Sequence, residues 1–427
     1  MDRRERRGPG RGLLTVLLGA VGSGPLLLYG LSAASDSIIV DLGISEAQFG
    51  LLATACFACA AIGNATLGRI ADRQSDTSLM TLVFVLSTAA LALVAIPASF
   101  WMLLIAAGIS GIAQSFPNGI TNRILLERVP VSKRIGWVGI KQSGVQVSQL
   151  TASLAFPLLA AAAGWRGAAL AIAIVPLVLM VMTWQSLRVT PVLPEHLSPP
   201  AGANESITAG SVDAEPNDSG EHGAEPIDAE TPDSSGHPGM VWALAAFGLL
   251  NGIGVQATNV YMPLFAVREL GFSLVLGGLT AAVAGAIGVA ARVGWARKMA
   301  HGASGPRLLL LLALIATAGA VTFYIAGTSG WAWLLWVAAA LHGTSALGVS
   351  VVLMSALMRS IPATSMASAS GMVTAGMFTG FALGPLGMGV LVGSPGGFSL
   401  GWAAVGLVYL LCVLLAFGLM RTSRRTE

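Results

Sequence analysis

The sequence has little charge and little cysteine. Asp, Glu, Lys and Arg make up only 10% of its 427 residues, while hydrophobic residues make up 55%. Because soluble domains carry roughly 25% charged residues, this composition excludes an ordinary soluble protein and predicts a chain that lies in a lipid bilayer. The three cysteines, Cys56, Cys59 and Cys412, are too few for a disulfide framework. Cys56 and Cys59 stand in an apolar segment without other soft ligands, so we expect packing rather than metal binding.

The sequence also lacks the commonest signatures of catalysis. It contains no Gly-rich phosphate loop with its Lys, no H-E-x-x-H and no G-x-S-x-G. These absences leave ATP-driven pumping and the commoner intramembrane hydrolases without support. We therefore expect no enzyme, no bound cofactor or metal, and no nucleic-acid partner.

Long apolar runs are what the sequence does contain. Twelve of them approach the ~20 residues that a helix needs to cross a bilayer. This predicts an all-α membrane protein with twelve transmembrane helices in two pseudo-symmetric six-helix bundles. The predicted spans are 13–40, 46–68, 78–97, 101–122, 135–160, 167–187, 240–265, 272–295, 306–326, 331–356, 364–392 and 400–420.

These spans group into bundles at 13–188 and 240–420, with short tails at 1–12 and 421–427. The segment between the bundles, 189–239, holds ten of the chain's twenty acidic residues and no Lys or Arg. Such a segment cannot bury enough apolar surface to offset the entropy of ordering it. We therefore expect a disordered acidic linker.

Basic residues gather at one set of predicted loops. With the N-terminus in the cytoplasm, 20 of the 23 Lys and Arg residues face the cytoplasm, Arg292 and Arg297 among them. Arg166 and Arg268 face outward, and Lys141 lies within a span. Because cytoplasmic loops carry the excess of Lys and Arg, we expect a multi-pass protein of the cytoplasmic membrane with both termini and the linker inside the cell.

The two halves match each other at nearly constant offsets. At an offset of 228, Asp41-Leu42-Gly43-Ile44-Ser45 falls on Glu269-Leu270-Gly271-Phe272-Ser273, and Arg69 falls on Arg297. At an offset of 232, Val129-Pro130 falls on Ile361-Pro362. These matches predict a duplicated six-helix unit, which is the architecture of transporters whose two halves rock about a central site.

One loop resembles a known family. Gly68-Arg69-Ile70-Ala71-Asp72-Arg73 is similar to the motif between helices 2 and 3 of the major facilitator superfamily, although Ser75, Asp76 and Thr77 replace that motif's Gly and basic tail. A second copy at 295–301 has Ala300 in place of the Asp. The resemblance implies alternating access to a central cavity.

The same resemblance implies a conformational latch, whose residues would be Gly68, Arg69, Asp72, Arg73 and Arg297. A carboxylate just past a helix end pairs with a neighbouring cation or faces a helix N-terminus, and such a contact biases one conformation over another. An ordinary charged turn is the alternative.

Polar side chains within the spans are costly in a bilayer and mark candidate binding sites. The cavity candidates are Lys141, Gln142, Gln146 and Gln149 in one stripe, Gln114 and Asn118 in a second, and Tyr29, Asn251 and Asn259 on the first and seventh spans. A cationic group in a central cavity suits an anionic substrate. Alternatively, Lys141 snorkels to the headgroups and the glutamines hold helices together.

Two residues are candidates for proton coupling. Asp36 lies near the outer end of the first span, where desolvation favours proton binding, unless the helix end is solvated there. His342 is the one His within the predicted spans, and it either shuttles protons or bonds to a neighbouring helix.

Together these features predict a monomeric secondary transporter that moves a small solute through the lipid bilayer by alternating access. We expect import of a small organic or inorganic anion, by symport with protons. A multidrug or metabolite exporter working by proton antiport is the second interpretation, favoured by Met354, Met358, Met372, Met377 and Phe378. The third is a membrane sensor or assembly protein that transports nothing and binds a partner through its linker.

Overall fold

The computed structural model describes residues 10–67, 71, 73–96, 99–190, 238–360 and 366–426. Within these ranges all regular structure is helical, as the composition predicts. Nearly all of the predicted linker lies outside the described residues, as do Gly68, Arg69 and Asp72 of the predicted latch. The disorder expected of the linker therefore stays a prediction.

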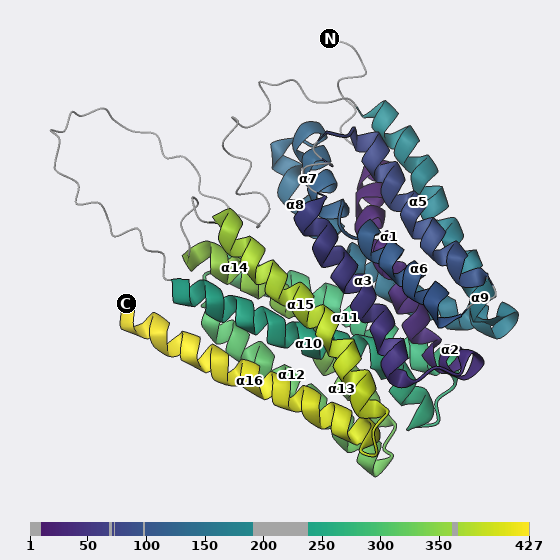
Figure 1. The fold of residues 1–427 in the computed structure, drawn as a ribbon. Coiled ribbons are helices and arrows are strands. Elements are labelled where there is room, and N and C mark those ends of the chain that lie inside the picture. The colour runs from purple at the N-terminus through teal and green to yellow at the C-terminus, as the bar shows by residue number, and fades with distance from the viewer. Residues whose placement is uncertain are drawn as a thin grey trace, which may run out of the picture.

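Eight described α-helices form the first half of the chain, and seven described α-helices with one 3-10 turn form the second half. The first half contains α1 Arg11–Ala33, α2 Ser35–Leu42, α3 Glu46–Thr66, α5 Asp76–Ala95, α6 Phe100–Ala113, α7 Pro117–Arg128, α8 Val131–Gln142 and α9 Gly144–Val189. The second half contains α10 Pro238–Arg268, α11 Leu274–Ala300, α12 Gly305–Ser329, α13 Trp333–Thr344, the 3-10 turn η3 Ala346–Gly348, α14 Val349–Ser360, α15 Met366–Val392 and α16 Gly397–Thr426. Figure 1 shows the two halves as separate bundles.

The predicted number of membrane crossings is confirmed. Eleven described segments are long and apolar enough to cross a membrane, and one of them, Gly136–Val189, has 54 residues. This long segment turns at Gly164, whose φ of 70° lies in the left-handed region that glycine adopts without strain. It therefore crosses twice, which gives twelve crossings in the described part of the chain.

Matching residues of the two halves adopt the same backbone conformation and cap the following helix in the same way. Gly43 and Gly271 both take left-handed backbone conformations, with φ of 60° and 68°. The Oγ of Ser45 accepts a hydrogen bond from the Gln48 amide at 3.2 Å, and Ser273 caps α11 in the same way. The repeated sequence thus encodes a repeated turn and helix start, as a duplicated unit requires.

Several crossings are interrupted where the sequence predicts continuous spans. The first bends at Ala34 between α1 and α2, and the fourth is broken over residues 114–116 between α6 and α7. The fifth breaks at Ser143, and the tenth is interrupted by η3. Non-helical backbone at membrane depth persists only where protein or water satisfies its polar groups. We therefore infer that these breaks face the interior of the molecule rather than the lipid.

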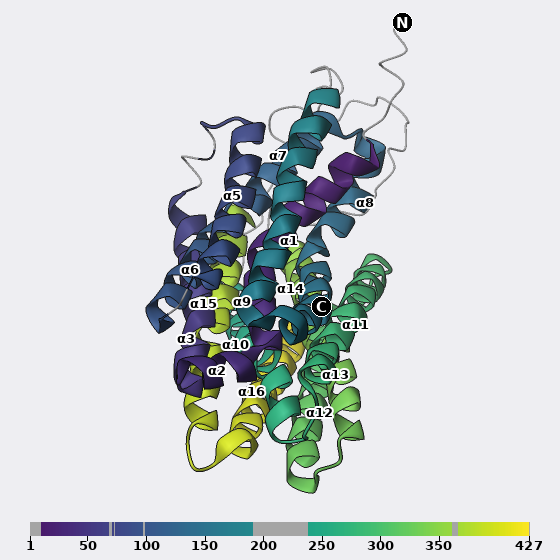
Figure 2. The same ribbon diagram turned by 90° about the vertical axis from the view of Figure 1, so that its right-hand side faces the viewer.

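The halves meet mainly at one end. We call the end with Arg11 and Val189 the terminal end, and the opposite end, with the turns at Gly43 and Gly271, the loop end. The halves pack through α3 on α15 and α9 on α11, and α10 also contacts α1 and α2. Figures 1 and 2 show the bundles converging toward the loop end and apart at the terminal end.

Glycines permit this close contact between the halves. A Cβ on Gly50 of α3 would lie 2.3 Å from the Pro385 carbonyl oxygen of α15. A Cβ on Gly278 of α11 would lie 2.4 Å from the Ser153 carbonyl oxygen of α9. Both separations are far below van der Waals contact, so only a residue without a side chain lets these backbones approach.

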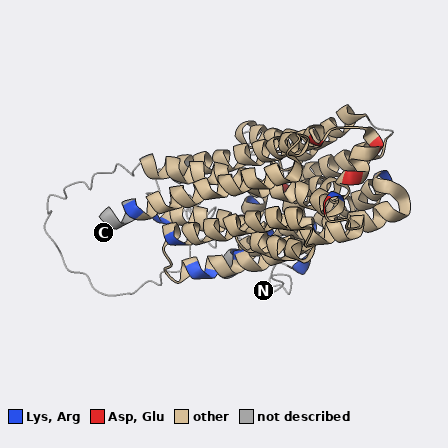
Figure 3. Ribbon diagram, turned by 90° about the horizontal axis from the view of Figure 1, so that it is seen from below, with Lys and Arg blue, Asp and Glu red and all other residues tan. Residues whose placement is uncertain are grey.

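Charge divides between the two ends. Four of the six described acidic residues lie at the loop end, where Arg166 and Arg268 are the described basic residues; the four are Asp36, Asp41, Glu46 and Glu269. Asp76 and Glu127 lie at the terminal end, with most of the described Lys and Arg. Figure 3 shows the acidic segments gathered toward one end of the bundle.

Candidate functional site

A hydrogen-bonded polar cluster lies where the two halves touch in the middle of the bundle. Gln149 of α9 donates through Nε2 to Oδ1 of Asn259 on α10, at 3.2 Å, and approaches the Ala281 carbonyl oxygen of α11 at 3.4 Å. Nε2 of His342 on α13 lies 3.1 Å from the same Asn259 oxygen. All three side chains are at most 3% exposed. The cluster therefore joins one helix of the first half to three helices of the second.

The cluster retains polar atoms without partners. Oε1 of Gln149 and Nδ2 of Asn259 are buried and accept or donate no hydrogen bond within the described structure. One helical turn away on each helix, Oε1 of Gln146 and Oε1 of Gln256 are buried and unpartnered as well. Each such atom costs roughly 1–3 kcal/mol, so four in one region mark a place for a polar ligand or water rather than ordinary packing.

Tyr29 and Asn251 flank this cluster. Tyr29 of α1 is 4% exposed and lies beside Gln256, with the guanidinium of Arg292 near enough to act on it electrostatically. Asn251 of α10 donates to the Ala346 carbonyl oxygen in η3, at 3.4 Å. Asn251 thus satisfies the interrupted backbone of the tenth crossing.

Arg292 is a further functional candidate, which the sequence analysis counts only among the cytoplasm-facing basic residues. It lies inside the predicted span 272–295, and α11, which continues to Ala300, carries it to the contact between the halves. Its Nε donates to the Leu347 carbonyl oxygen of η3 at 3.0 Å, and its Nη1 reaches the Gln142 carbonyl oxygen of the other half at 3.5 Å. No described carboxylate lies within ion-pair distance of it.

A helical pattern in the sequence could have identified Arg292. Ala281, Gly285, Gly288 and Arg292 follow one another at spacings of four, three and four residues, so they share one face of α11. Ala281 and Gly285 of that face contact Gln149. The face toward the polar cluster therefore ends in a half-buried cation.

Lys141 lies in a different environment from the one that the sequence predicts. Its side chain is fully buried, and Nζ donates to Thr121 Oγ1 at 2.8 Å and to Asn122 Oδ1, both on α7. It has no described ion pair and no described contact with Gln149 or Asn259. Lys141 thus holds α7 and α8 together, within the first half of the chain.

The other cavity candidates divide between the two environments. Gln142 contributes its backbone carbonyl oxygen to Arg292. Gln114 donates to the sulfur of Cys56 at 3.0 Å inside the first half. Asn118, one turn further on at the start of α7, is exposed. The structure thus joins Gln149, Asn259 and His342 directly, places Gln146 and Tyr29 beside them, and leaves Gln114 and Asn118 apart.

Asp36 is part of an ion-pair cluster that crosses the two halves at the loop end. Nε of Arg268 on α10 lies 2.7 Å from Asp36 Oδ1 on α2, and its Nη1 lies 2.6 Å from Glu46 Oε1 on α3. The three side chains are between 22% and 30% exposed. We call this cluster the clasp. The alternative interpretation of Asp36 is a solvated helix end. It accounts for the partial exposure of the carboxylate, but not for its ion pair with Arg268.

The predicted latch is described in part only. Arg73 and Arg297 are both exposed and form no described ion pair. The nearby Asp76 instead pairs with Arg123 of α7 at 2.8 Å. The role of the latch stays a prediction, because the remaining residues lie outside the described part.

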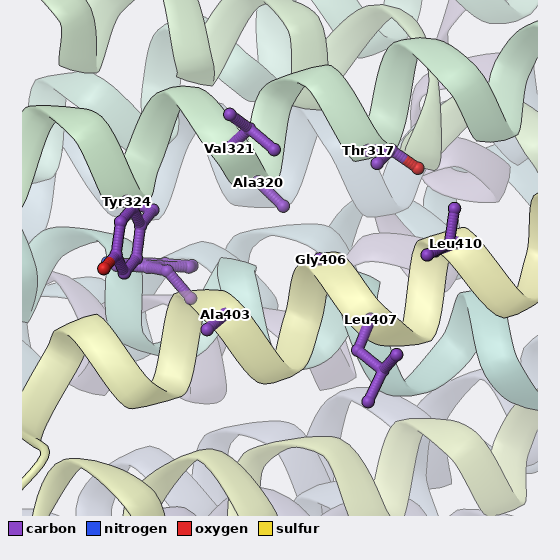
Figure 4. A pocket seen from close by; sticks show the side chains of 9 residues that line it. Thr317, Ala320, Val321, Tyr324, Ala403, Gly406, Leu407 and Leu410 are labelled. Atoms are coloured by element: carbon purple, nitrogen blue, oxygen red, sulfur yellow. The ribbon is translucent and has the colours of Figure 1, made fainter.

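A shallow groove of about 390 Å³ lies elsewhere, between α12 and α16. Figure 4 shows Tyr324, Thr317, Gly406 and Leu410 along it. Its lining is overwhelmingly apolar, and Leu410 and Tyr324 are exposed on the outer surface. It matches a surface that faces lipid chains, so it is no candidate for a polar solute.

Comparison with known proteins supports a transport function. The family model of the Major Facilitator Superfamily matches residues 13–375. A candidate metabolite transport protein of Haemophilus influenzae is 32% identical over 132 residues. That match covers 31% of this chain and 32% of the relative, so it spans about a third of the relative's length.

Solved structures of transporters share the fold along almost the whole chain. A bacterial homolog of the human lysosomal transporter Spinster, inward-facing and occupied, has a TM-score of 0.72 at 16% identity, with 97% of this chain and 98% of that chain covered. A D-xylose-proton symporter has a TM-score of 0.71 at 15% identity, with 95% and 96% covered. The family model, which matches most of the chain, shows that the chain belongs to the Major Facilitator Superfamily and is a multi-pass membrane transporter of small solutes.

Proposed function

We propose that this transporter carries a small organic anion through the centre of the bundle by alternating access. The observation that carries the proposal is Arg292, a half-buried cation at the contact between the halves that has no carboxylate partner among the described residues. The six described acidic residues all lie toward the ends of the bundle, which leaves the interior positive. A desolvated cation without a counter-ion favours a negatively charged ligand.

We also propose that the termini lie in the cytoplasm. Most described Lys and Arg residues stand at the terminal end, which supports this orientation. In that case the conformation described here faces inward, since the halves touch at the loop end and separate at the terminal end. Uptake into the cell by proton symport, with Asp36 or His342 binding the proton, follows from the sequence analysis and remains part of the proposal.

The test compares two arginines of the same helix. Arg292→Gln removes the half-buried charge and keeps a hydrogen-bond donor for Leu347, whereas Arg297→Gln removes an exposed charge about one turn further along. We expect Arg292→Gln to weaken anion binding at least tenfold and Arg297→Gln to leave it unchanged. Isothermal titration on purified protein and uptake into proteoliposomes measure the two effects.

Equal anion affinity of the two variants would contradict the proposal. Retained affinity with lost uptake would instead assign Arg292 to the conformational change. The thermal unfolding temperature of each variant without ligand shows whether the substitution disturbs the fold. The rise of that temperature on adding the anion reports binding, because a bound substrate stabilises only the folded protein.

A second candidate function is efflux of amphipathic apolar compounds. Phe57 of α3 lies 5.3 Å from Phe381 of α15 and 6.5 Å from Phe378, measured between ring centroids. Met377, beside them on α15, is partly buried. An adaptable aromatic and methionine surface between the halves suits varied apolar ligands. Transport of lipophilic cations that is unaffected by Arg292→Gln would favour this function over anion import.

A further inference from the structure

The polar cluster limits the chemistry of the substrate's uncharged part. Its free groups are amide oxygens on Gln146, Gln149 and Gln256 and an amide nitrogen on Asn259. The set therefore includes both acceptors and a donor, presented from α9 of the first half and α10 of the second. The chemical group that satisfies such a set must donate and accept hydrogen bonds.

A hydroxyl group meets this requirement, and charged groups do not. An ammonium donates only, and no described carboxylate stands near the cluster to balance its charge. A carboxylate accepts only, and it would face three unpartnered oxygens. An apolar chain would leave all four amide atoms without partners, at the cost that buried unpartnered groups carry.

The cation lies at a fixed separation from this cluster. Gly285 of α11 faces Gln149, and Arg292 is seven residues further along the same unbroken helix, about 10 Å at 1.5 Å per residue. A six-carbon chain with one hydrogen bond at each end covers this distance.

We propose that the substrate is a polyhydroxy monocarboxylate with a chain of about six carbons, an aldonic acid in chemical class. Its carboxylate faces Arg292, and its hydroxyl groups bond to the amides of Gln149 and Asn259. This inference rests on the proposed function, because it takes the anionic end from there and adds the hydroxylated end. It excludes zwitterionic amino acids and aliphatic acids as preferred substrates.

Three ligands of equal chain length test the two ends separately. Gluconate carries the carboxylate and the hydroxyl groups, hexanoate carries only the carboxylate, and sorbitol carries only hydroxyl groups. We expect gluconate to bind the unmodified protein at least tenfold more tightly than either of the others, in isothermal titration of the purified full chain. This comparison needs no substitution, so it does not depend on the folding of a variant.

The outcomes separate this inference from the proposed function. If hexanoate binds as tightly as gluconate, the hydroxyl inference is wrong and the anion proposal stands. If sorbitol binds as tightly as gluconate, the anion proposal is wrong. If gluconate does not bind at all, the inference is wrong, and uptake of other organic anions still decides the proposed function.

A substitution in the cluster provides the second arm. Gln149→Leu should reduce the preference for gluconate over hexanoate at least tenfold, because gluconate loses a hydrogen bond while hexanoate no longer faces the unpartnered Gln149 amide. Gln185→Leu, an exposed amide near the terminal end of the same α9, serves as the matched control and should change neither affinity. An unchanged preference in Gln149→Leu would overturn the assignment of the hydroxyl groups to this cluster.

Discussion

Lys141 is a buried cation whose described partners are all neutral. Nζ bonds to Thr121 and Asn122, and these contacts join α8 to α7 in the terminal half of the first bundle. The charge adds to the positive interior that Arg292 creates, while the ammonium itself is engaged away from the polar cluster. At the residue scale, the proposed function assigns the ligand contact to Arg292. The hydrogen bonds of Lys141 instead join two helices of the first half.

This division predicts the effect of Lys141→Met. The substitution keeps the length of the side chain and leaves the Thr121 and Asn122 oxygens without their donor, at a cost of about 1–3 kcal/mol in stability. We expect a lower unfolding temperature of the detergent-solubilised protein and a smaller loss of anion affinity than Arg292→Gln causes. Complete loss of anion binding at an unchanged unfolding temperature would instead restore Lys141 as a direct substrate contact, the role that the sequence predicts.

Single residues show the limit of what the sequence predicts. Amide stripes single out Gln149 and Asn259 as candidates, yet their bond spans 110 positions of the chain, and no periodicity specifies that pairing. The partners of Arg292 are equally absent from any local pattern. Its guanidinium bonds to the carbonyl oxygens of Leu347 and Gln142, which lie 55 and 150 positions away in the chain.

At the scale of elements, the length of each apolar run determines where the chain crosses the membrane. The twelve predicted spans correspond to the described crossings because a helix in lipid must satisfy its own backbone over the full thickness of the bilayer. The breaks at Ala34, Ser143 and η3 were not predicted, since they depend on partners from other elements. Asn251, for example, donates to the carbonyl oxygen of Ala346 in η3.

The clasp joins elements of both halves at the loop end, so its loss should favour opening there. Arg268→Gln removes the cation between Asp36 and Glu46, whereas Arg166→Gln removes a cation that pairs with Asp41 inside the first half at 2.8 Å. Partly exposed pairs contribute about 0–1 kcal/mol each, so we expect a several-fold shift in population rather than a complete one.

Spin labels at Val40 and Leu276, both exposed at the loop end of opposite halves, would report this shift as a longer distance. Arg268→Gln should increase the fraction of long distances, and Arg166→Gln should leave the distribution unchanged. A similar change in both variants would show that lost charge, rather than the broken link between the halves, is responsible.

At the scale of the whole molecule, the two halves are related units that touch along one part of their length. The apolar core that spans both halves includes Phe49, Tyr261 and Phe265, whereas a second core of Leu13, Phe84 and Ile124 belongs to the terminal end of the first half alone. The sequence predicts the duplication and the two bundles. It does not predict at which end they meet, because alternating access gives one sequence more than one arrangement of the same halves.

Contact at the loop end depends on backbone approach at Gly50, and this gives the test at the largest scale. A side chain there would meet the Pro385 carbonyl oxygen at 2.3 Å and the Tyr261 hydroxyl at 2.6 Å, both in the second half. Gly50→Leu should therefore prevent closure of the loop end while leaving each bundle folded. Gly119→Leu, at a position of α7 in the first half with open space around it, is the matched control.

We expect Gly50→Leu to bind substrate from the loop-end side and to lose transport across proteoliposomes, while Gly119→Leu retains transport. Cysteine accessibility at loop-end positions should rise in the first variant only. Normal transport by Gly50→Leu would mean that the α3–α15 contact is not required during the cycle, and the loop end would then have to close through the α9–α11 contact and the contacts of α10 with α1 and α2.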